Sequence, residues 1–330
     1  MKILKRLSEI IHFRKTLEET VRFYTRNESI GLHQRLEELK AQIRIQYHTD
    51  KALNSTESGV SSQRICENEI IVSLTSYSAR IYDVFLPIES IMQGSVKPNR
   101  IVLWLSKDEF KDDMLPVVLN NQRKRGLEIR YCDDIRSYKK LIPSLKAFPN
   151  SAIITIDDDL IYDFDLVEKL VESYNRDKSS IHANRLNRIS FDKNGHLLSY
   201  LDWDSSEMMP CSVDEFYFFT SGGGTLFPPN IFTQEVFNKD IFMKICPTGD
   251  DIWFNAMARL ANTKIRKAYT RHPNGVDFIS LDYLQSSALS NVNNNPDNCA
   301  NDIQIKAVFG QYKILDKLKK ACNYDIITML

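Results

Sequence analysis

Apolar residues follow two spacings along this chain of 330 residues. From about residue 68, short apolar runs rich in β-branched residues alternate with stretches in which apolar side chains recur every three or four positions. The first spacing is typical of buried strands and the second of amphipathic helices. The runs predict strands at residues 70–74, 101–105, 127–131 and 152–156. The helical spacing predicts helices over residues 81–92, 115–125, 138–147 and 164–175. This alternation predicts an α/β fold with a mostly parallel central sheet flanked by helices.

The pattern is less regular after residue 179. Short apolar pieces at residues 189–191 and 197–201 are interpreted as additional strands, and so is the aromatic run at 216–220. Helical spacing returns before Leu260 and again over residues 302–320.

Residues 1–48 form a separate region with helical spacing, in which we expect two helices that break near residues 27–31. The first helix carries an excess of Lys and Arg. This N-terminal helical extension could therefore make peripheral contact with an anionic membrane or dimerise, and packing on its own domain is the alternative. The expected order is the extension, a Ser-, Thr- and Asn-rich linker at 49–67, a domain at 68–275, and a C-terminal loop and helix at 276–330 that pack on the domain.

Composition narrows the protein class. The chain is 43% hydrophobic and 26% charged, as in ordinary globular proteins. Lys plus Arg and Asp plus Glu both number 43, so no net field favours a nucleic-acid partner. The six cysteines lack zinc-type pairs, which favours free thiols in a reducing compartment. No apolar stretch reaches the roughly 20 residues of a membrane span. We therefore expect a cytoplasmic protein, with peripheral contact at the inner face of the membrane left open.

Three consecutive acids, Asp157, Asp158 and Asp159, end the apolar run that begins at Ile153. A buried strand cannot continue into adjacent charges unless it emerges from the core, so the acids are expected at the carboxyl end of the strand. Ligands bind at that edge of open α/β sheets, and a hard divalent cation neutralises clustered carboxylates. The sequence therefore predicts a metal site, and a solvated surface turn is the alternative.

Three groups of polar residues are expected at the same edge of the sheet. They are Thr75, Tyr77 and Arg80 after the first strand, Asp133 and Asp134 after the third, and Lys139 and Lys140 in the next helix. Hydroxyls, an aromatic face and cations could hold a nucleotide and its phosphates, while a carboxylate could accept hydrogen bonds from a base or ribose. The alternatives are a packed tyrosine, an acid that caps the following helix, and lysines on a solvated face.

Two later segments add candidate chemistry. Three adjacent glycines at 222–224 permit a ligand to lie against the backbone, although a flexible turn would also use them. Asp250 and Asp251 follow Gly249 and could cap a helix, or hold an acceptor hydroxyl and remove its proton. His272 lies further downstream and is a candidate metal ligand.

The order of these motifs resembles that of the GT-A glycosyltransferases, nucleotide-sugar-dependent enzymes of the family-2-like, bacterial surface-polysaccharide type. The resemblance covers residues 68–275 and implies the Rossmann-like GT-A fold. The family motifs are matched by Asp157-Asp158-Asp159 for the metal motif, Gly222-Gly223-Gly224 for the acceptor-side loop, Gly249-Asp250-Asp251 for the acidic motif and His272 for the metal-binding histidine. Asp250 stands where the family usually has Glu, which leaves open which acid is the base.

The resemblance implies a metal-dependent, inverting hexosyltransferase. In it, Asp157, Asp159 and His272 would hold Mn²⁺ or Mg²⁺ against a nucleotide diphosphate sugar, with a UDP-sugar favoured. Asp158, Gly223 and Gly224 would contact this donor. Asp251, with Asp250 beside it, would deprotonate a hydroxyl of a glycan or lipid-linked acceptor.

Two other functions stay open at this point. A nucleotidyltransferase uses a similar sheet and acidic metal site, but its usual glycine-rich loop after the first strand is missing, since residues 75–80 contain no glycine. A non-catalytic scaffold or glycan-binding protein would use the acids only for a structural cation.

Overall fold

The computed structural model describes residues 30–32, 34–204, 214–269, 278–281, 293–295 and 299–319. The chain divides into two compact units, Met1–His48 and Thr49–Leu330. In the described part of the chain, residues 30–32 and 34–54 are helical, so the helix continues six residues into the segment expected to be a linker. No helix among the described residues is long and apolar enough to cross a membrane.

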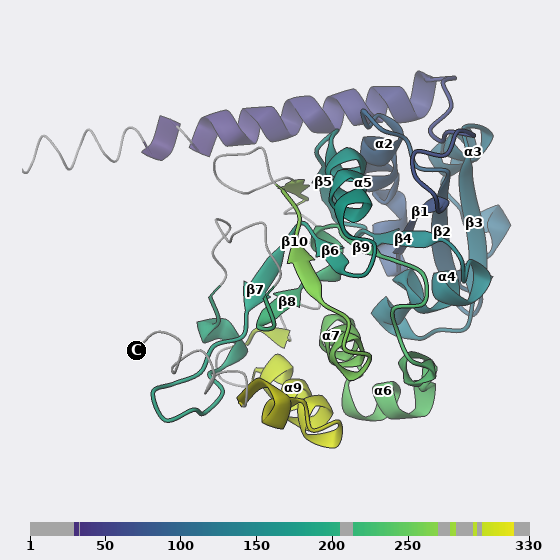
Figure 1. Cartoon of the computed structure of the whole chain (residues 1–330). Helices are drawn as coiled ribbons and strands as arrows, with labels where there is room; N and C mark the ends of the chain where they lie inside the picture. Colours follow the sequence, from purple (N-terminus) through teal and green to yellow (C-terminus); the bar gives the residue numbers. More distant parts are fainter. Residues whose placement is uncertain are drawn as a thin grey trace, which may run out of the picture. The chain divides into compact units, whose positions relative to one another are not determined.

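The second unit is built on a seven-stranded sheet with the strand order β10-β6-β9-β4-β1-β2-β3 (Figure 1). Its strands are β1 (Ile70–Thr75), β2 (Arg100–Ser106), β3 (Leu127–Cys132), β4 (Ala152–Thr155), β6 (Ile181–Ala183), β9 (Thr225–Phe227) and β10 (Ile265–Lys267). Neighbouring strands are parallel except that β9 runs antiparallel to both β4 and β6. The predicted mostly parallel α/β sheet is confirmed.

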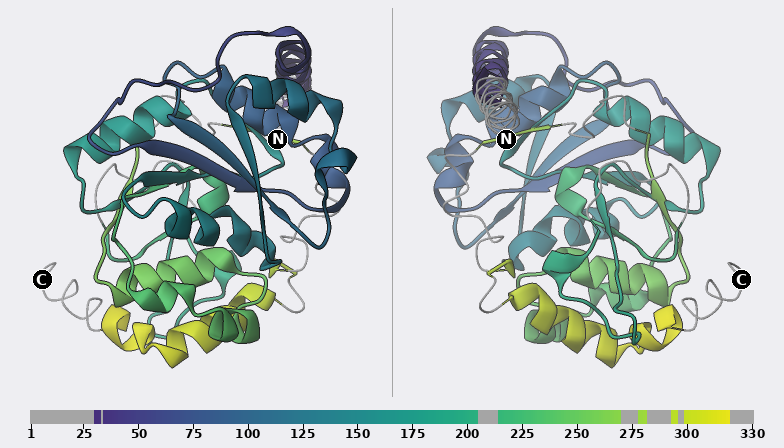
Figure 2. Two further views of the ribbon diagram at one scale, coloured as in Figure 1. Left: turned by 90° about the vertical axis from the view of Figure 1, so that its right-hand side faces the viewer. Right: turned by 90° about the vertical axis from the view of Figure 1, so that its left-hand side faces the viewer.

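Helices cover both faces of this sheet (Figure 2), and β1 is therefore buried on both sides. Ile70, Val72 and Leu74 belong to one apolar cluster, which also contains residues of α2 (Phe85–Met92), α3 (Val117–Lys124) and α5 (Leu166–Arg176). Ile71 points to the other face and a second cluster, with residues of α4 (Ile142–Ala147), α6 (Lys239–Ile245), α7 (Asp250–Leu260) and α9 (Ala300–Gln311). This alternation follows the two-residue period of a strand.

Prolines divide two of the predicted helices. The segment 81–92 forms the 3₁₀ turn Ser78–Tyr82 and then α2, and the segment 138–147 forms the 3₁₀ turn Arg136–Lys140 and then α4. Pro87 and Pro143 lie in the first turns of α2 and α4, where a missing backbone N–H leaves no hydrogen bond unmade. The helices therefore begin just before the prolines, at Phe85 and Ile142, each four residues later than the apolar spacing indicated.

The region after residue 179 differs most from the prediction. No strand forms at residues 189–191 or 197–201, where one bridge joins Phe191 to Leu197 across a tight turn. The described strands here are short. Besides β6, β9 and β10 of the main sheet, β7 (Leu186–Arg188) pairs with β8 (Tyr217–Phe219), and β11 (Phe278–Ser280) pairs with the earlier strand β5 (Leu160–Tyr162). The helix predicted over residues 302–320 is also interrupted, because α9 ends at Gln311 and Lys313 adopts a φ of 53°.

Candidate active site

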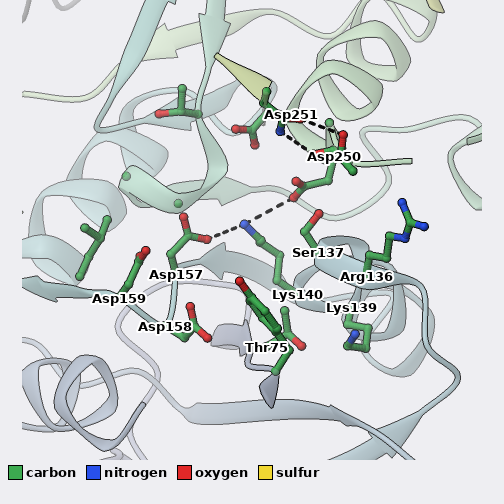
Figure 3. Close-up of a pocket in the computed structure, with 18 of the residues that line it drawn as sticks. Thr75, Arg136, Ser137, Lys139, Lys140, Asp157, Asp158, Asp159, Asp250 and Asp251 are labelled. Carbon is green, nitrogen blue, oxygen red and sulfur yellow. Dashed lines mark hydrogen bonds and ion pairs between the residues drawn. The ribbon is translucent and has the colours of Figure 1, made fainter. Parts of the chain in front are cut away.

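The carboxyl ends of β1 and β4 and the N-terminus of α7 open onto one cavity of about 710 Å³. Its walls include residues from the turns after β1 and β4, the 3₁₀ turn Arg136–Lys140 and the first turn of α7. The loop with the three adjacent glycines at 222–224, called the glycine loop below, also contributes. Asp157, Asp158, Asp159, Asp250 and Asp251 all line it (Figure 3). Two acidic groups separated by about 90 residues of sequence therefore meet at one site, at the strand edge where the sequence placed it.

The three acids after β4 have different surroundings. Asp157 has the most exposed side chain of the three, at 35%, and its backbone N–H donates to the hydroxyl of Tyr162 (2.8 Å). Asp158 is buried and accepts hydrogen bonds from Ser76 Oγ and Arg80 Nη1, both at 2.7 Å. Asp159 lies 3.1 Å from the same Arg80 nitrogen. Burial raises the pKa of Asp158 to about 6, although Arg80 and Ser76 act in the opposite direction.

Lys140 connects the two acidic groups. Its side chain is only 8% exposed, and its Nζ lies 2.5 Å from Asp157 Oδ1 and 3.4 Å from Asp250 Oδ2 (Figure 3). Burial acts to lower the pKa of Lys140, but the surrounding carboxylates raise it well above its ordinary value. A permanent positive charge therefore lies between the acids of β4 and those of α7.

Asp250 and Asp251 occupy the first turn of α7, and neither caps it through its side chain, because Gly249 is the N-cap residue. Asp251 Oδ1 instead accepts hydrogen bonds from the backbone N–H (2.9 Å) and hydroxyl (2.5 Å) of Ser221. Burial raises the pKa of Asp251, and the neighbouring charge of Asp250 raises it further. Lys140 and Ser221 oppose this shift without cancelling it. Asp251 thus has the raised pKa that suits a general base.

The glycine loop brings the backbone against the first acidic group. A Cβ on Gly222 would lie 1.7 Å from Asp157 Oδ2, so no other residue fits at this position while the aspartate keeps its place. Gly222 and Gly223 line the cavity, and Gly224 does not. Gly224 adopts a φ of 94°, and a Cβ there would meet Leu166 Cδ1 at 2.7 Å, so its role in the loop is conformational.

The predicted nucleotide contacts after β1 all line the cavity. Thr75 donates a hydrogen bond to the carbonyl of Trp104 (2.8 Å) and thereby ties the end of β1 to β2. The guanidinium of Arg80 lies 5.2 Å from the centre of the Tyr77 ring, which presents an aromatic face beside the buried ion pairs.

Not all of the nucleotide contacts predicted after β3 lie at the cavity. Asp134, Lys139 and Lys140 line the cavity, whereas Asp133 does not. Asp133 forms an exposed ion pair with Lys107 (2.5 Å). Asp134 accepts a hydrogen bond from the backbone N–H of Arg136 (3.0 Å) and pairs with Lys139. It therefore also stabilises the following 3₁₀ turn, which is close to the capping role given above as the alternative.

The predicted metal ligands are Asp157, Asp159 and His272. His272 lies outside the described residues, and within them no three His, Cys, Asp or Glu residues form a group that could hold a metal. Asp157 and Asp159 nevertheless fit Mn²⁺ or Mg²⁺, since both offer hard carboxylate oxygens to one cavity. Magnesium commonly binds through one or two carboxylates and completes its shell with water and substrate phosphates.

Several residues of the site carried no usable signal in the sequence. Ser221 orients Asp251, and Arg185 and Thr248 line the cavity from loops that have no strand or helix periodicity. Tyr200 lines it from the 3₁₀ turn Tyr200–Asp202, where the apolar pattern had indicated a strand. A serine beside three glycines was visible as part of a turn, but its pairing with an acid 30 residues later depends on the tertiary fold. Only the placement of β8 and α7 beside each other makes that contact.

No protein-family model and no curated protein matches the sequence. Among solved structures, TarS residues 1–349 from S. aureus resembles the chain with 11% identity and a TM-score of 0.43, over 68% of this chain and 64% of that one. This chain thus spans less than two thirds of that structure. A Bacillus anthracis protein assigned as a glucose-1-phosphate thymidylyltransferase has 12% identity, a TM-score of 0.35, and coverage of 61% and 87%.

A third structure is the mannosyltransferase PcManGT from Pyrobaculum calidifontis in complex with GDP-Man and Mn²⁺. It has 12% identity and a TM-score of 0.30, over 42% of each chain. At these identities and TM-scores, the three likenesses do not establish a shared function.

Proposed function

We propose that this chain is a GT-A-type glycosyltransferase that moves a hexosyl group from a nucleotide diphosphate sugar to a hydroxyl group, with inversion at the anomeric carbon. One observation carries the proposal. The acids at the carboxyl end of β4 and those at the N-terminus of α7 line a single cavity, and Lys140 lies between them. Such a site can stabilise a leaving group at one end and activate a nucleophile at the other.

Asp251 is the proposed base, rather than Asp250. Asp250 is paired with the ammonium of Lys140 at 3.4 Å, whereas Asp251 is held by Ser221 through one oxygen. The raised pKa of Asp251 favours proton uptake from an acceptor hydroxyl. Asp250 would keep Lys140 in place and maintain that raised pKa.

The other end of the cavity suits a diphosphate. Lys140 and the backbone of the glycine loop lie beside Asp157, where negative charge would develop as the sugar bond breaks. Asp157 and Asp159 would hold Mn²⁺ or Mg²⁺, which would supply further stabilisation of that charge when bound. Tyr77 and Thr75 would contact the base or ribose, by their position at the end of β1. The donor is proposed to be a UDP-sugar, and the acceptor a glycan or lipid-linked sugar of a surface polysaccharide.

The test is donor turnover by the purified chain against a panel of nucleotide sugars, with Mn²⁺ or with a chelator. We expect release of free nucleoside diphosphate from one donor, dependent on metal and strongly reduced in Asp159→Ala. Asp251→Asn should abolish transfer to an acceptor. A matched control is Asp240→Asn, an exposed acid in the first turn of α6, which should retain full activity.

Other outcomes would contradict the proposal. Formation of pyrophosphate and a nucleotide sugar from a nucleoside triphosphate and a sugar phosphate would assign a nucleotidyltransferase. No turnover together with no metal-dependent nucleotide binding would leave a scaffold or glycan-binding protein.

We also propose that the N-terminal helix contacts an anionic membrane surface. Leu32, Leu36, Leu39, Ile43 and Tyr47 are 47–71% exposed and fall within one stripe at 100° per residue. The basic residues Arg35, Lys40 and Arg44 flank this stripe. Anionic lipid would complement these cations while its apolar part covers the stripe.

Vesicle co-sedimentation tests this contact. The chain should bind vesicles that contain phosphatidylglycerol and not vesicles of phosphatidylcholine alone, and Leu39→Ser/Ile43→Ser should weaken the binding. Point substitutions are preferable to deletion, because the carbonyls of Lys51 and Glu57 accept hydrogen bonds from Arg125 in the second unit. A solution dimer that these substitutions dissociate, without vesicle binding, would assign the stripe to a second copy.

A further inference from the structure

Arg185 differs from the other cations of the cavity. Arg80, Lys139 and Lys140 each form an ion pair with at least one carboxylate. Arg136 donates a hydrogen bond to the carbonyl of Pro247 (3.2 Å). Within the described part of the chain, the guanidinium of Arg185 has no hydrogen bond or ion pair, although it is exposed and lines the cavity. It is a positive charge in the site that no carboxylate of the described residues pairs with.

The backbone of Arg185 is nevertheless firmly held. Arg185 lies between β6 and β7, and its carbonyl accepts hydrogen bonds from the N–H (3.2 Å) and Oγ1 (3.4 Å) of Thr220. A Cβ on Gly223 would lie 2.4 Å from Arg185 Cβ, so the glycine loop makes room for this side chain. The guanidinium carbon lies 5.8 Å from the centre of the Phe278 ring. The arginine is therefore positioned by packing and backbone contacts rather than by an acid.

Two neighbours of Arg185, Gly223 and Tyr200, connect it with the two acidic groups of the site. Gly223, against which it packs, follows Gly222, which contacts Asp157. Tyr200 also lines the cavity, and burial raises its pKa to about 12. The charge of Asp251 contributes to this increase and the charge of Arg185 opposes it, so Tyr200 lies close to both. Arg185 thus packs on the loop next to the proposed leaving-group end and acts on Tyr200, which the charge of the proposed base Asp251 also reaches.

We propose that Arg185 binds a phosphate group of the substrates, either in the diphosphate of the donor or in a phosphate carried by the acceptor. A guanidinium presents paired N–H donors that match phosphate oxygens, and one without a protein acid is open to an anionic ligand. This inference rests on the proposed transfer reaction for its role in catalysis. The phosphate site itself can be tested without that reaction.

The first test is binding of pyrophosphate and of UDP, without metal, to the full chain. Arg185→Gln should weaken one or both affinities by about 10- to 100-fold, as expected for the loss of a charge-assisted hydrogen bond, and should leave uridine binding unchanged. Arg185→Lys should recover only part of the affinity, because an ammonium cannot donate in the paired geometry. The matched control is Arg188→Gln on β7, since Arg188 pairs with Asp214 (3.2 Å) and does not line the cavity.

A second test distinguishes the two sources of phosphate. If Arg185 binds the donor, the variant should lose UDP affinity and slow donor hydrolysis by water. If it binds the acceptor, UDP affinity and hydrolysis should be unchanged, and the KM for a phosphate-bearing acceptor should rise at least tenfold relative to an uncharged one.

Failure of this inference can be told from failure of the proposed function. Suppose that wild type binds pyrophosphate, Arg185→Gln does not, and the chain turns over no nucleotide sugar. The phosphate site would then be supported and the transferase function refuted. Equal pyrophosphate and UDP affinities, and equal kinetics with both acceptors, in wild type and in Arg185→Gln of the same thermal stability would overturn the inference.

Discussion

At the residue scale, the pH dependence of transfer should report on Asp251. The base must be deprotonated, so activity should fall as pH decreases through the pKa of Asp251, which burial and the charge of Asp250 hold above its ordinary range. Asp250→Asn removes that charge and should move the acidic limb of the kcat/KM profile to lower pH. Exchanged roles would appear as an inactive Asp250→Asn and an active Asp251→Asn.

Lys140 gives a second prediction at this scale. Its side chain and that of Asp250 are both nearly buried, at 8% and 9% exposure, so Lys140→Met leaves a carboxylate without its compensating charge. We expect a loss of about 3 kcal/mol in the free energy of unfolding, measured by urea denaturation. Lys140→Met/Asp250→Asn should be more stable than the single variant. If the single and the double variant lose the same free energy of unfolding, the unpaired carboxylate of Asp250 is not the cause of the loss.

At the element scale, the glycine loop should control the position of Asp157. Gly222→Ala introduces a Cβ 1.7 Å from Asp157 Oδ2, which must move the carboxylate or the loop. A misplacement of about 1 Å at a reacting site can cost about 100-fold in rate, so kcat should fall by that order while the fold is retained. Gly310→Ala in α9 is the control, because its Cβ would meet nothing within 4 Å. Unchanged kcat in Gly222→Ala would remove the loop from the mechanism.

The elements also show what sequence could predict. The strands β1, β2 and β4 were predictable because each is an apolar run buried on both faces, and β3 because Leu127, Ile129 and Tyr131 alternate with polar residues. The acids that end β4 indicated the edge of the site. The short strands β6 and β9 were not, because three residues give too little periodicity, and the antiparallel β9 depends on its pairing with β4 and β6. Arg185 lies between β6 and the equally short β7, so no pattern of residues around it placed it in the cavity.

At the scale of the whole second unit, one buried ion pair joins segments far apart in the sequence. Arg125 follows α3 and is 3% exposed, and it binds both oxygens of the fully buried Glu89 of α2 at 2.8 and 2.9 Å. The same guanidinium donates to the carbonyls of Glu57 (2.7 Å) and Lys51 (3.3 Å). It therefore fixes the segment before β1 against the helices that cover one face of the sheet.

This arrangement predicts a strongly asymmetric effect of mutation. Arg125→Met leaves the carboxylate of Glu89 buried and unpaired and frees two carbonyls, so we expect a loss of about 3–5 kcal/mol in the free energy of unfolding. Arg125→Met/Glu89→Gln removes the buried charge and should recover part of that loss, while the backbone hydrogen bonds stay absent. Limited proteolysis should then cut the double variant between residues 51 and 61 faster than wild type. If the double variant instead resists proteolysis there as well as wild type does, and recovers the full free energy of unfolding, then Arg125 does not hold this segment.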